Sequence, residues 1–198
     1  METANILVSG GIGCGKSFVL EAFNALGIPS YDADSRAKGL YDTDSALLAA
    51  VVDAAGEDVL SSDGRLDRRM LASKIFASPE LRARIEALVH PAVMRDFARW
   101  RDEQDCPLAI MESAILLEHP ELLADMDWKL VVTAPMDVRM KRIAARDNTT
   151  GEQIAAQMAS QWSDERRVAL ADFVIENDGI QAILPQIIVF LKQIKFIR

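Results

Sequence analysis

One short segment of this chain has the residue types and the spacing needed to hold a polyphosphate. Residues 10–17 read GGIGCGKS and match G-x-x-x-x-G-K-[ST] at every fixed position. Small residues let successive backbone N–H groups turn inward around phosphate oxygens. We expect Lys16, a candidate catalytic residue, to reach the β- and γ-phosphates of a nucleotide, and the hydroxyl of Ser17 to bind Mg²⁺. The residues expected to surround the phosphates are Gly10, Gly11, Ile12, Gly13, Cys14, Gly15, Lys16, Ser17 and Phe18.

The residues on either side of this segment predict the two elements that a phosphate loop requires. Residues 5–9 form a short apolar run typical of a buried strand, and residues 18–26 have apolar positions at helical spacing. The alternative, a flexible glycine turn with a solvated lysine, requires neither a strand before it nor a helix after it. The order of strand, loop and helix therefore favours phosphate binding.

Two carboxylates follow the next predicted strand, which spans residues 27–31. Asp32 and Asp34 are two positions apart, so they either share a face of a continuing strand or flank the turn that leaves it. Either carboxylate can accept the proton of an attacking hydroxyl or hold Mg²⁺ through water. The structural alternative is a helix N-cap formed by Asp34 or Ser35. The phosphate loop favours the catalytic interpretation, but the pattern does not decide between the two aspartates.

Several arginines lie at helical spacing in the second half of the chain. Arg139, Arg142 and Arg146 are three and four positions apart, which places them along one face of a helix. A row of guanidinium groups suits a lid that closes over phosphates, and Arg166 and Arg167 add a second basic pair. The alternative is a basic helix face that contacts only solvent. Because the chain also has a phosphate loop, we favour the interpretation that these arginines belong to a lid.

Oxygen atoms are the expected ligands of any metal ion. Glu112 follows an apolar run and can hold Mg²⁺ through water, as a Walker B carboxylate does, or can orient the neighbouring loop. Asp32 is a second candidate for a contact through water. The chain has two histidines and two cysteines, none of them at the spacing of a zinc site. We therefore expect Mg²⁺, bound by Ser17 and by one of these carboxylates.

The overall composition limits the partners that this chain can have. Its 198 residues carry 22 basic and 30 acidic side chains, a net charge of −8, which argues against broad nucleic-acid binding. No apolar run approaches the ~18 residues that span a membrane, and no basic region precedes an apolar one at the amino terminus. We therefore expect a cytoplasmic protein with small-molecule substrates, no nucleic-acid or membrane partner, and a monomeric or weakly homo-oligomeric state.

Strand-like and helix-like segments alternate along the chain. Apolar runs predict buried parallel strands at residues 106–111, 128–133 and 173–175. Helical patterns occupy residues 36–103, 136–146, 152–170 and 180–194, with a break at 148–151. Together with the phosphate loop and the row of arginines, this alternation predicts an α/β fold of the P-loop NTPase type: a three-layer sandwich with a parallel five-stranded sheet, a helical insertion and a helical lid.

The expected boundaries follow from the order of these elements. We expect one compact unit over residues 1–198, because a chain of this length has room for one substantial core. The nucleotide-binding core is assigned to residues 1–34, 106–135 and 171–198. The helical insertion is assigned to residues 35–105 and the lid to residues 136–170.

Several separated segments together resemble the dephospho-CoA kinase family, and the resemblance covers essentially the whole chain. They are the loop at 10–17, Tyr31-Asp-Ala-Asp34 followed by Arg36, Leu66-Asp-Arg-Arg69 before Ile75-Phe76, Val89-His90-Pro91, and Ala171-Asp-Phe-Val-Ile-Glu-Asn177. The loop is common to P-loop proteins in general, whereas the ordered set is specific to this family.

The resemblance implies ATP-dependent phosphorylation of the ribose 3′-hydroxyl of dephospho-CoA, which gives coenzyme A and ADP in the last step of coenzyme A biosynthesis. It implies that the insertion holds the acceptor, that Asp34 is the general base and that Asp32 supports it or the metal. Arg142 matches the catalytic arginine that contacts the transferred phosphate, and Arg146 belongs to the lid at the ATP site. Ala114 departs from the family, because similar proteins usually carry a proline there.

Two other classes of protein share part of this pattern. A small-molecule P-loop kinase acting on a nucleoside or nucleotide would have the same loop, lid arginines and sheet, and would differ in its acceptor. A nucleotide switch that hydrolyses GTP needs a guanine-reading N-K-x-D segment, and no asparagine in this chain is followed by lysine. The sequence therefore favours a kinase, and the identity of the acceptor rests on the resemblance.

Overall fold

The computed structural model describes residues 3–147 and 150–197, so residues 148 and 149 of the predicted break lie outside the described residues. Contacts divide the chain into two compact units. Unit 1 runs up to Tyr31 and resumes at Gln104, and unit 2 spans Asp32–Glu103. Where the sequence predicted one unit with an insertion at 35–105, the second unit begins at 32 and ends at 103.

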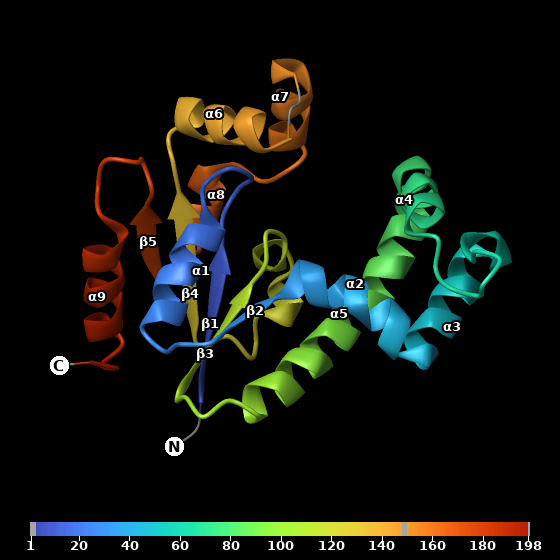
Figure 1. The fold of residues 1–198 in the computed structure, drawn as a ribbon, viewed down its shortest axis with the longest axis horizontal. Coiled ribbons are helices and arrows are strands. Elements are labelled where there is room, and N and C mark those ends of the chain that lie inside the picture. Colours follow the sequence, from blue (N-terminus) through green and yellow to red (C-terminus); the bar gives the residue numbers. More distant parts are fainter. Residues whose placement is uncertain (1–2, 148–149, 198) are drawn as a thin grey trace. The chain divides into compact units, whose positions relative to one another are not determined.

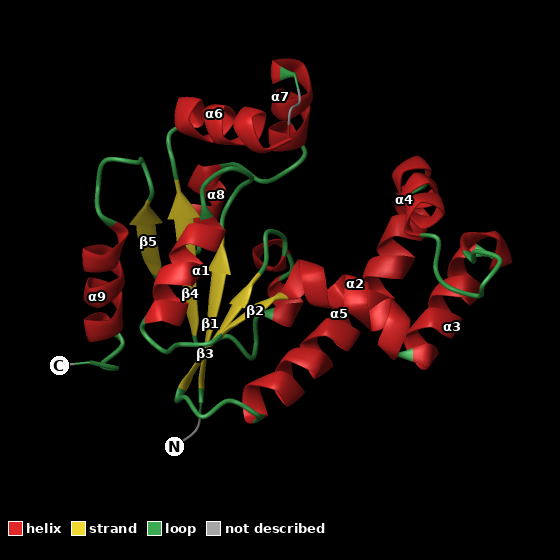
Figure 2. Cartoon of the chain, viewed as in Figure 1, coloured by secondary structure: helices red, strands yellow, loops and turns green. Residues whose placement is uncertain are grey.

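The chain contains a five-stranded sheet with the strand order β2-β3-β1-β4-β5 (Figure 2). Its strands are β1 (Ala4–Ser9), β2 (Ser30–Asp32), β3 (Leu108–Glu112), β4 (Trp128–Thr133) and β5 (Phe173–Glu176). The central strand β1 pairs in parallel with β3 and β4, and β4 pairs in parallel with β5. The residues of β1, β3 and β4 are mostly buried and apolar, as expected for a parallel sheet covered on both faces. The predicted parallel five-stranded sheet is confirmed.

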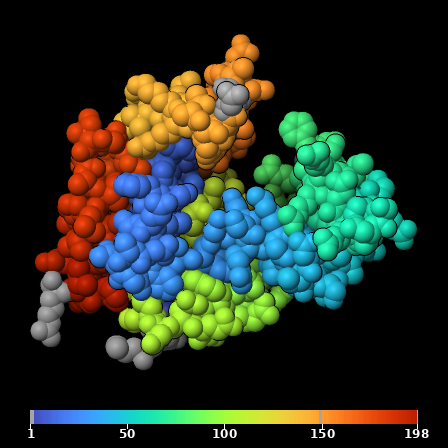
Figure 3. All heavy atoms as spheres, in the orientation of Figure 1, coloured from blue at the N-terminus to red at the C-terminus, as the bar shows by residue number. Residues whose placement is uncertain are grey.

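The helices of unit 1 are α1 (Lys16–Ala25), α6 (Met136–Asp147), α7 (Gly151–Ala159), α8 (Asp164–Val168) and α9 (Ile183–Gln193). α8 contacts β4, α9 contacts β5 and α1 contacts α9, whereas α6 and α7 lie beyond the carboxyl ends of the strands (Figure 1). On the face seen in Figure 3, the side chains of α1 (blue) and α9 (red) adjoin. Phe23 of α1 meets Phe190 of α9 edge to face, with ring centroids 6.4 Å apart, and both rings are fully buried. The predicted α/β sandwich of the P-loop type is confirmed.

The region predicted as a lid contains a helix break that the sequence analysis did not predict. The helix predicted over 152–170 is two helices, α7 and α8, separated by residues 160–163. The hydroxyl of Ser163 accepts the backbone N–H of Arg166 at 3.3 Å and so caps α8. Thr150 begins α7 with a capping box. Apolar spacing continues through the break, so the cap rather than the spacing decides where α8 begins.

Unit 2 is built from helices and their caps. Its elements are α2 (Ala33–Thr43), α3 (Ser45–Ala55), the 3₁₀ turn η1 (Glu57–Val59), α4 (Arg68–Ala77) and α5 (Pro79–Asp102). Asp44, Asp67 and Ser78 each cap the helix that follows by accepting backbone N–H groups of its first turn. The long helix α5 contacts α2, α3 and α4. The predicted helical character of this part of the chain is therefore confirmed.

A buried carboxylate joins α5 to α2 inside unit 2. Asp96 of α5 is 5% exposed, and its oxygens accept hydrogen bonds from Arg36 Nε at 2.8 Å and Arg99 Nη2 at 2.7 Å. Arg36 belongs to α2, so the pair links two helices that are adjacent in the unit. A buried carboxylate is stable only while it is paired and hydrogen-bonded.

We predict that Asp96→Asn lowers the free energy of unfolding by about 1–3 kcal/mol, because it keeps the side-chain volume and removes the charge that both arginines contact. Urea unfolding measures the change. The matched control is Asp102→Asn in the same helix, where the side chain is 68% exposed, and we expect a change of about 0.5 kcal/mol or less. Equal losses in the two variants would contradict the role given to Asp96.

Candidate active site

The predicted phosphate loop forms the turn between β1 and α1. β1 ends at Ser9 and α1 begins at Lys16, so residues 10–15 cross from the sheet to the helix. Gly15 precedes the helix with a left-handed backbone (φ 87°) and provides no side-chain cap for the N–H groups of the first turn. A helix start of this kind binds anions through its free N–H groups and the positive end of its dipole. The order of strand, loop and helix is confirmed.

Lys16 and Glu112 form an ion pair beside the loop. Lys16 Nζ lies 3.3 Å from Oε1 of Glu112 and 3.1 Å from the carbonyl oxygen of Gly10, to which it donates. Glu112 ends β3 opposite Val8 of β1, which brings its side chain to the start of the loop. Both side chains are mostly buried, at 13 and 14% exposure. The structure therefore brings together the predicted phosphate-binding lysine and the predicted Walker B carboxylate.

Asn177 and Arg142 hold the second half of the loop. Asn177, directly after β5, is buried and donates from Nδ2 to the carbonyl oxygen of Cys14 at 2.9 Å. Arg142 Nη1 donates to the same carbonyl at 3.3 Å and to the carbonyl of Asn177 at 3.0 Å. The approach is so close that a Cβ on Gly15 would lie 2.2 Å from Asn177 Nδ2. No role was predicted for Asn177, although its position directly after a predicted strand was the available signal in the sequence.

The three arginines of α6 have different surroundings. Arg139 is 5% exposed and pairs with Asp164 at 2.8 Å. Arg142 contacts the loop. Arg146 lies in the last turn with its side chain 63% exposed, and its hydrogen bond to Asp147 lowers the pKa of that carboxyl. Arg139 and Arg142 reach the loop, whereas Arg146 pairs with the adjacent Asp147. The three arginines that share one face of the helix therefore differ in burial and in the groups that they contact.

The second basic pair is also divided. Arg167 is fully buried, pairs with Glu118 at 3.1 Å and donates to the carbonyl oxygen of Trp162. The guanidinium carbon of Arg166 lies 3.3 Å from the centroid of the Trp162 ring, a cation–π contact. Arg167 is therefore paired inside the protein, whereas Arg166 lies against the ring of Trp162.

Asp32 and Asp34 lie in unit 2, on either side of the start of α2. Asp32 caps this helix, because its carboxylate accepts the backbone N–H of Ser35 at 2.9 Å and the hydroxyl of Ser35 at 2.6 Å. Asp34 lies in the first turn and is exposed. The two aspartates therefore flank the turn from strand to helix, and the cap is Asp32 rather than Asp34 or Ser35.

Cys14 lies inside the loop and is 1% exposed. Burial raises the pKa of its thiol, even though Lys16 and Arg139 act in the opposite direction. The thiol is therefore protonated near neutral pH, and a protonated buried thiol is a poor nucleophile and metal ligand. Cys14 contributes its packing and its backbone carbonyl to the site.

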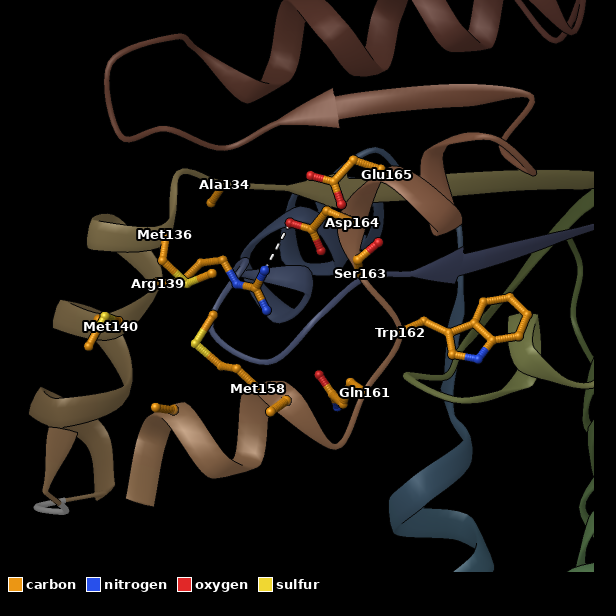
Figure 4. A pocket seen from close by; sticks show the side chains of 12 residues that line it. Ala134, Met136, Arg139, Met140, Met158, Gln161, Trp162, Ser163, Asp164 and Glu165 are labelled. Carbon is orange, nitrogen blue, oxygen red and sulfur yellow. Dashed lines mark hydrogen bonds and ion pairs between the residues drawn. The ribbon is translucent and has the colours of Figure 1, made fainter. Parts of the chain in front are cut away.

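A pocket of about 560 Å³ opens beside the loop within unit 1 (Figure 4). The thioether side chains of Met136, Met140 and Met158 line its apolar part, and they come from α6 and α7. The ion pair of Arg139 and Asp164 lines its polar part, as the dashed line in Figure 4 shows. The pocket is therefore bounded by the predicted lid region and by an arginine that reaches the loop.

The oxygen atoms beside the loop suit a magnesium ion. In the described ranges, 3–147 and 150–197, no three His, Cys, Asp or Glu side chains gather into a metal cluster. Mg²⁺ at kinase sites takes one or two protein oxygens and completes its shell with phosphates and water. Ser17 in the first turn of α1 and Glu112 at the end of β3 are donors of this kind.

Comparisons with known proteins identify the family. The dephospho-CoA kinase family model matches residues 5–182. The dephospho-CoA kinase of Bacteroides fragilis is 38% identical over 182 residues, which cover 91% of this chain and 88% of that protein. The dephospho-CoA kinase of Yersinia pestis is 36% identical over 181 residues, which cover 91% and 87%.

Solved structures agree with the sequence comparisons. A protein from Thermus thermophilus superimposes with a TM-score of 0.86 at 28% identity, over 98% of this chain and 99% of that one. The dephospho-CoA kinase from Campylobacter jejuni has a TM-score of 0.65 at 23% identity over 97% of both chains, which supports the fold. Because the family model spans most of the sequence and two curated relatives exceed 35% identity, this chain belongs to the dephospho-CoA kinase family.

Proposed function

We propose that this chain transfers the γ-phosphoryl group of ATP to the ribose 3′-hydroxyl of dephospho-CoA, with coenzyme A and ADP as products. The observation that carries this proposal is the family match over residues 5–182 in a chain whose phosphate loop is complete and holds a paired lysine. The match favours this acceptor over the alternative, another nucleoside or nucleotide.

The loop and the start of α1 are proposed to bind the triphosphate. The N–H groups of residues 13–18 would face its oxygens, and Lys16 would exchange Glu112 for the β- and γ-phosphates. The carboxylate holds the lysine close to the loop before the nucleotide arrives. A phosphate carries more negative charge than a carboxylate and competes well for the same ammonium group.

Arg142 is proposed to stabilise the charge of the transferred phosphoryl group. Its contacts with Cys14 and Asn177 hold the guanidinium against the loop, so little reorganisation is needed when charge develops nearby. Arg146, at the end of the same helix, is proposed as an outer contact of ATP within the lid, residues 136–170.

Mg²⁺ is proposed as the metal, with Ser17 as its direct ligand and a carboxylate holding it through water. Glu112 is favoured over Asp32 for this second role, because the carboxylate of Asp32 already accepts two hydrogen bonds from Ser35. When bound, Mg²⁺ neutralises charge on the β- and γ-phosphate oxygens.

Asp34 is proposed as the general base for the acceptor hydroxyl. It is exposed in the first turn of α2, and among the described residues no hydrogen bond or ion pair engages its carboxylate. The carboxylate of Asp32, in contrast, is used in capping the helix. Asp34 is therefore the better candidate for accepting a proton, and Asp32 stabilises the start of the helix that carries Asp34.

The remaining assignments concern whole elements and the cell. Acceptor binding is assigned to unit 2, which corresponds to the predicted insertion at 35–105. Within the described residues, no helix is long and apolar enough to cross a membrane. We place the enzyme in the cytoplasm as a monomer or weak homo-oligomer without a nucleic-acid partner, and its net charge of −8 supports the last point.

We predict that Lys16→Ala lowers kcat for ADP release with dephospho-CoA by about 100-fold or more, since a preorganised cation at the transferred phosphate is lost. A coupled ADP assay measures the rate. The control is Lys141→Ala on α6, which removes a lysine that is 79% exposed and should leave the rate within about twofold. A Lys16→Ala enzyme with nearly normal kcat and an unchanged unfolding midpoint would refute the role of Lys16.

Two matched variants separate the roles of the aspartates. Asp34→Asn should lower kcat by about 100-fold or more, because an amide cannot accept the proton, and should leave the unfolding midpoint almost unchanged. Asp32→Asn should leave kcat within about tenfold, since asparagine also caps helices well. The ADP assay and thermal unfolding report both effects. The opposite order of kcat values would make Asp32 the base.

A further inference from the structure

Both backbone groups of Ile12, in the first half of the loop, are held by side chains from distant segments. The N–H of Ile12 donates to Oε1 of Gln161 at 2.9 Å. The carbonyl oxygen of Ile12 accepts a hydrogen bond from Nε of Arg139, also at 2.9 Å. Gln161 lies in the linker between α7 and α8, and Arg139 lies on α6. The two peptide groups that flank the α-carbon of Ile12 are therefore each held by a side chain of the predicted lid region.

The arginine in this arrangement is itself fixed. Arg139 is buried and pairs with Asp164 at 2.8 Å. Asp164 also lies 3.7 Å from Nη1 of the fully buried Arg167, whose Nη2 contacts Glu118 at 3.1 Å. This alternation of cations and carboxylates leaves Arg139 little freedom to leave Ile12.

The loop passes directly against the guanidinium group of Arg139. A Cβ built on Gly11 would lie 2.2 Å from Nη2 of Arg139. Glycine at this position therefore allows the close approach by which Arg139 reaches the carbonyl of Ile12. Figure 4 shows Arg139, Asp164 and Gln161 around the same pocket beside the loop.

We infer that Gln161 and Arg139 are positioning residues for nucleotide binding. They orient the two peptide groups on either side of Ile12. The N–H groups that follow, at residues 13–18, then face the phosphates without a rearrangement of the loop. The side-chain oxygen of Gln161 accepts its hydrogen bond from the loop, so Gln161 acts on the loop rather than on the nucleotide directly. Because Gln161 lies in the linker between α7 and α8, the position of this linker and the shape of the loop are coupled.

This inference rests on the nucleotide-binding part of the proposed function and does not depend on the identity of the acceptor. It is tested with Gln161→Met, which keeps the length of the side chain and removes the acceptor oxygen. The control is Gln193→Met, a change of the same kind at an exposed position on α9. Calorimetric titration with Mg–ADP, without any acceptor, gives the Kd of each variant.

The expected result is a Kd for ADP about three- to tenfold higher in Gln161→Met than in the wild type, the effect of one lost hydrogen bond on a preorganised loop. The KM for ATP should rise by the same factor, while kcat at saturating ATP stays within about twofold. The Gln193→Met control should bind ADP as the wild type does. This split between KM and kcat is not expected of a residue that contributes to folding alone.

An unchanged Kd for ADP in folded Gln161→Met would overturn the inference, and so would a fall in kcat with an unchanged Kd. If Gln161→Met does not fold, Asp164→Asn tests the same arrangement by weakening the hold on Arg139, with the same expected rise in Kd and the same overturning result. A wild-type enzyme that binds ADP but does not phosphorylate dephospho-CoA would count against the proposed acceptor and leave this inference intact.

Discussion

The shape of the phosphate loop is the constraint on which the rest of the structure depends. Four of the six residues at 10–15 are glycines, so the loop has few side chains with which to fix its own backbone. Its carbonyl oxygens at Ile12 and Cys14 are held instead by Arg139 and Arg142 of α6 and by Asn177 after β5. Those residues follow β4 and β5, whose carboxyl ends meet that of β1 at one edge of the sheet. The parallel sheet therefore supplies the loop with its supports.

A second constraint is the cost of keeping cations close together before a nucleotide binds. A site for a polyphosphate needs positive groups that would repel one another, and two of those near the loop are paired with carboxylates. Lys16 pairs with Glu112, and Arg139 pairs with Asp164. The first pair lies where a phosphate can replace the carboxylate, whereas the second fixes the loop itself. The cation of the first pair is therefore proposed to bind phosphate, and the cation of the second pair stabilises the conformation of the loop.

The fold could be predicted largely from the sequence, and the positions of individual side chains less so. The loop motif, the apolar strands and α6 depend on local patterns, and these predictions are confirmed. The environment of Arg139 depends on Asp164, a partner 25 positions along the chain that helical spacing does not reveal. The break between α7 and α8 depends on one cap at Ser163, inside a segment whose apolar spacing continues. Local periodicity predicts elements, but long-range pairing decides which charges face the site.

We propose above all that the enzyme phosphorylates dephospho-CoA with ATP held at the phosphate loop. The most direct measurement is ADP release by the wild-type enzyme with Mg²⁺ and ATP, with dephospho-CoA, adenosine, AMP or no acceptor, followed by phosphorus NMR of the product. We expect strong stimulation by dephospho-CoA alone and a new phosphomonoester on its ribose 3′-hydroxyl. Preferential stimulation by adenosine or AMP, or slow ADP release that no acceptor changes, would contradict the proposed function.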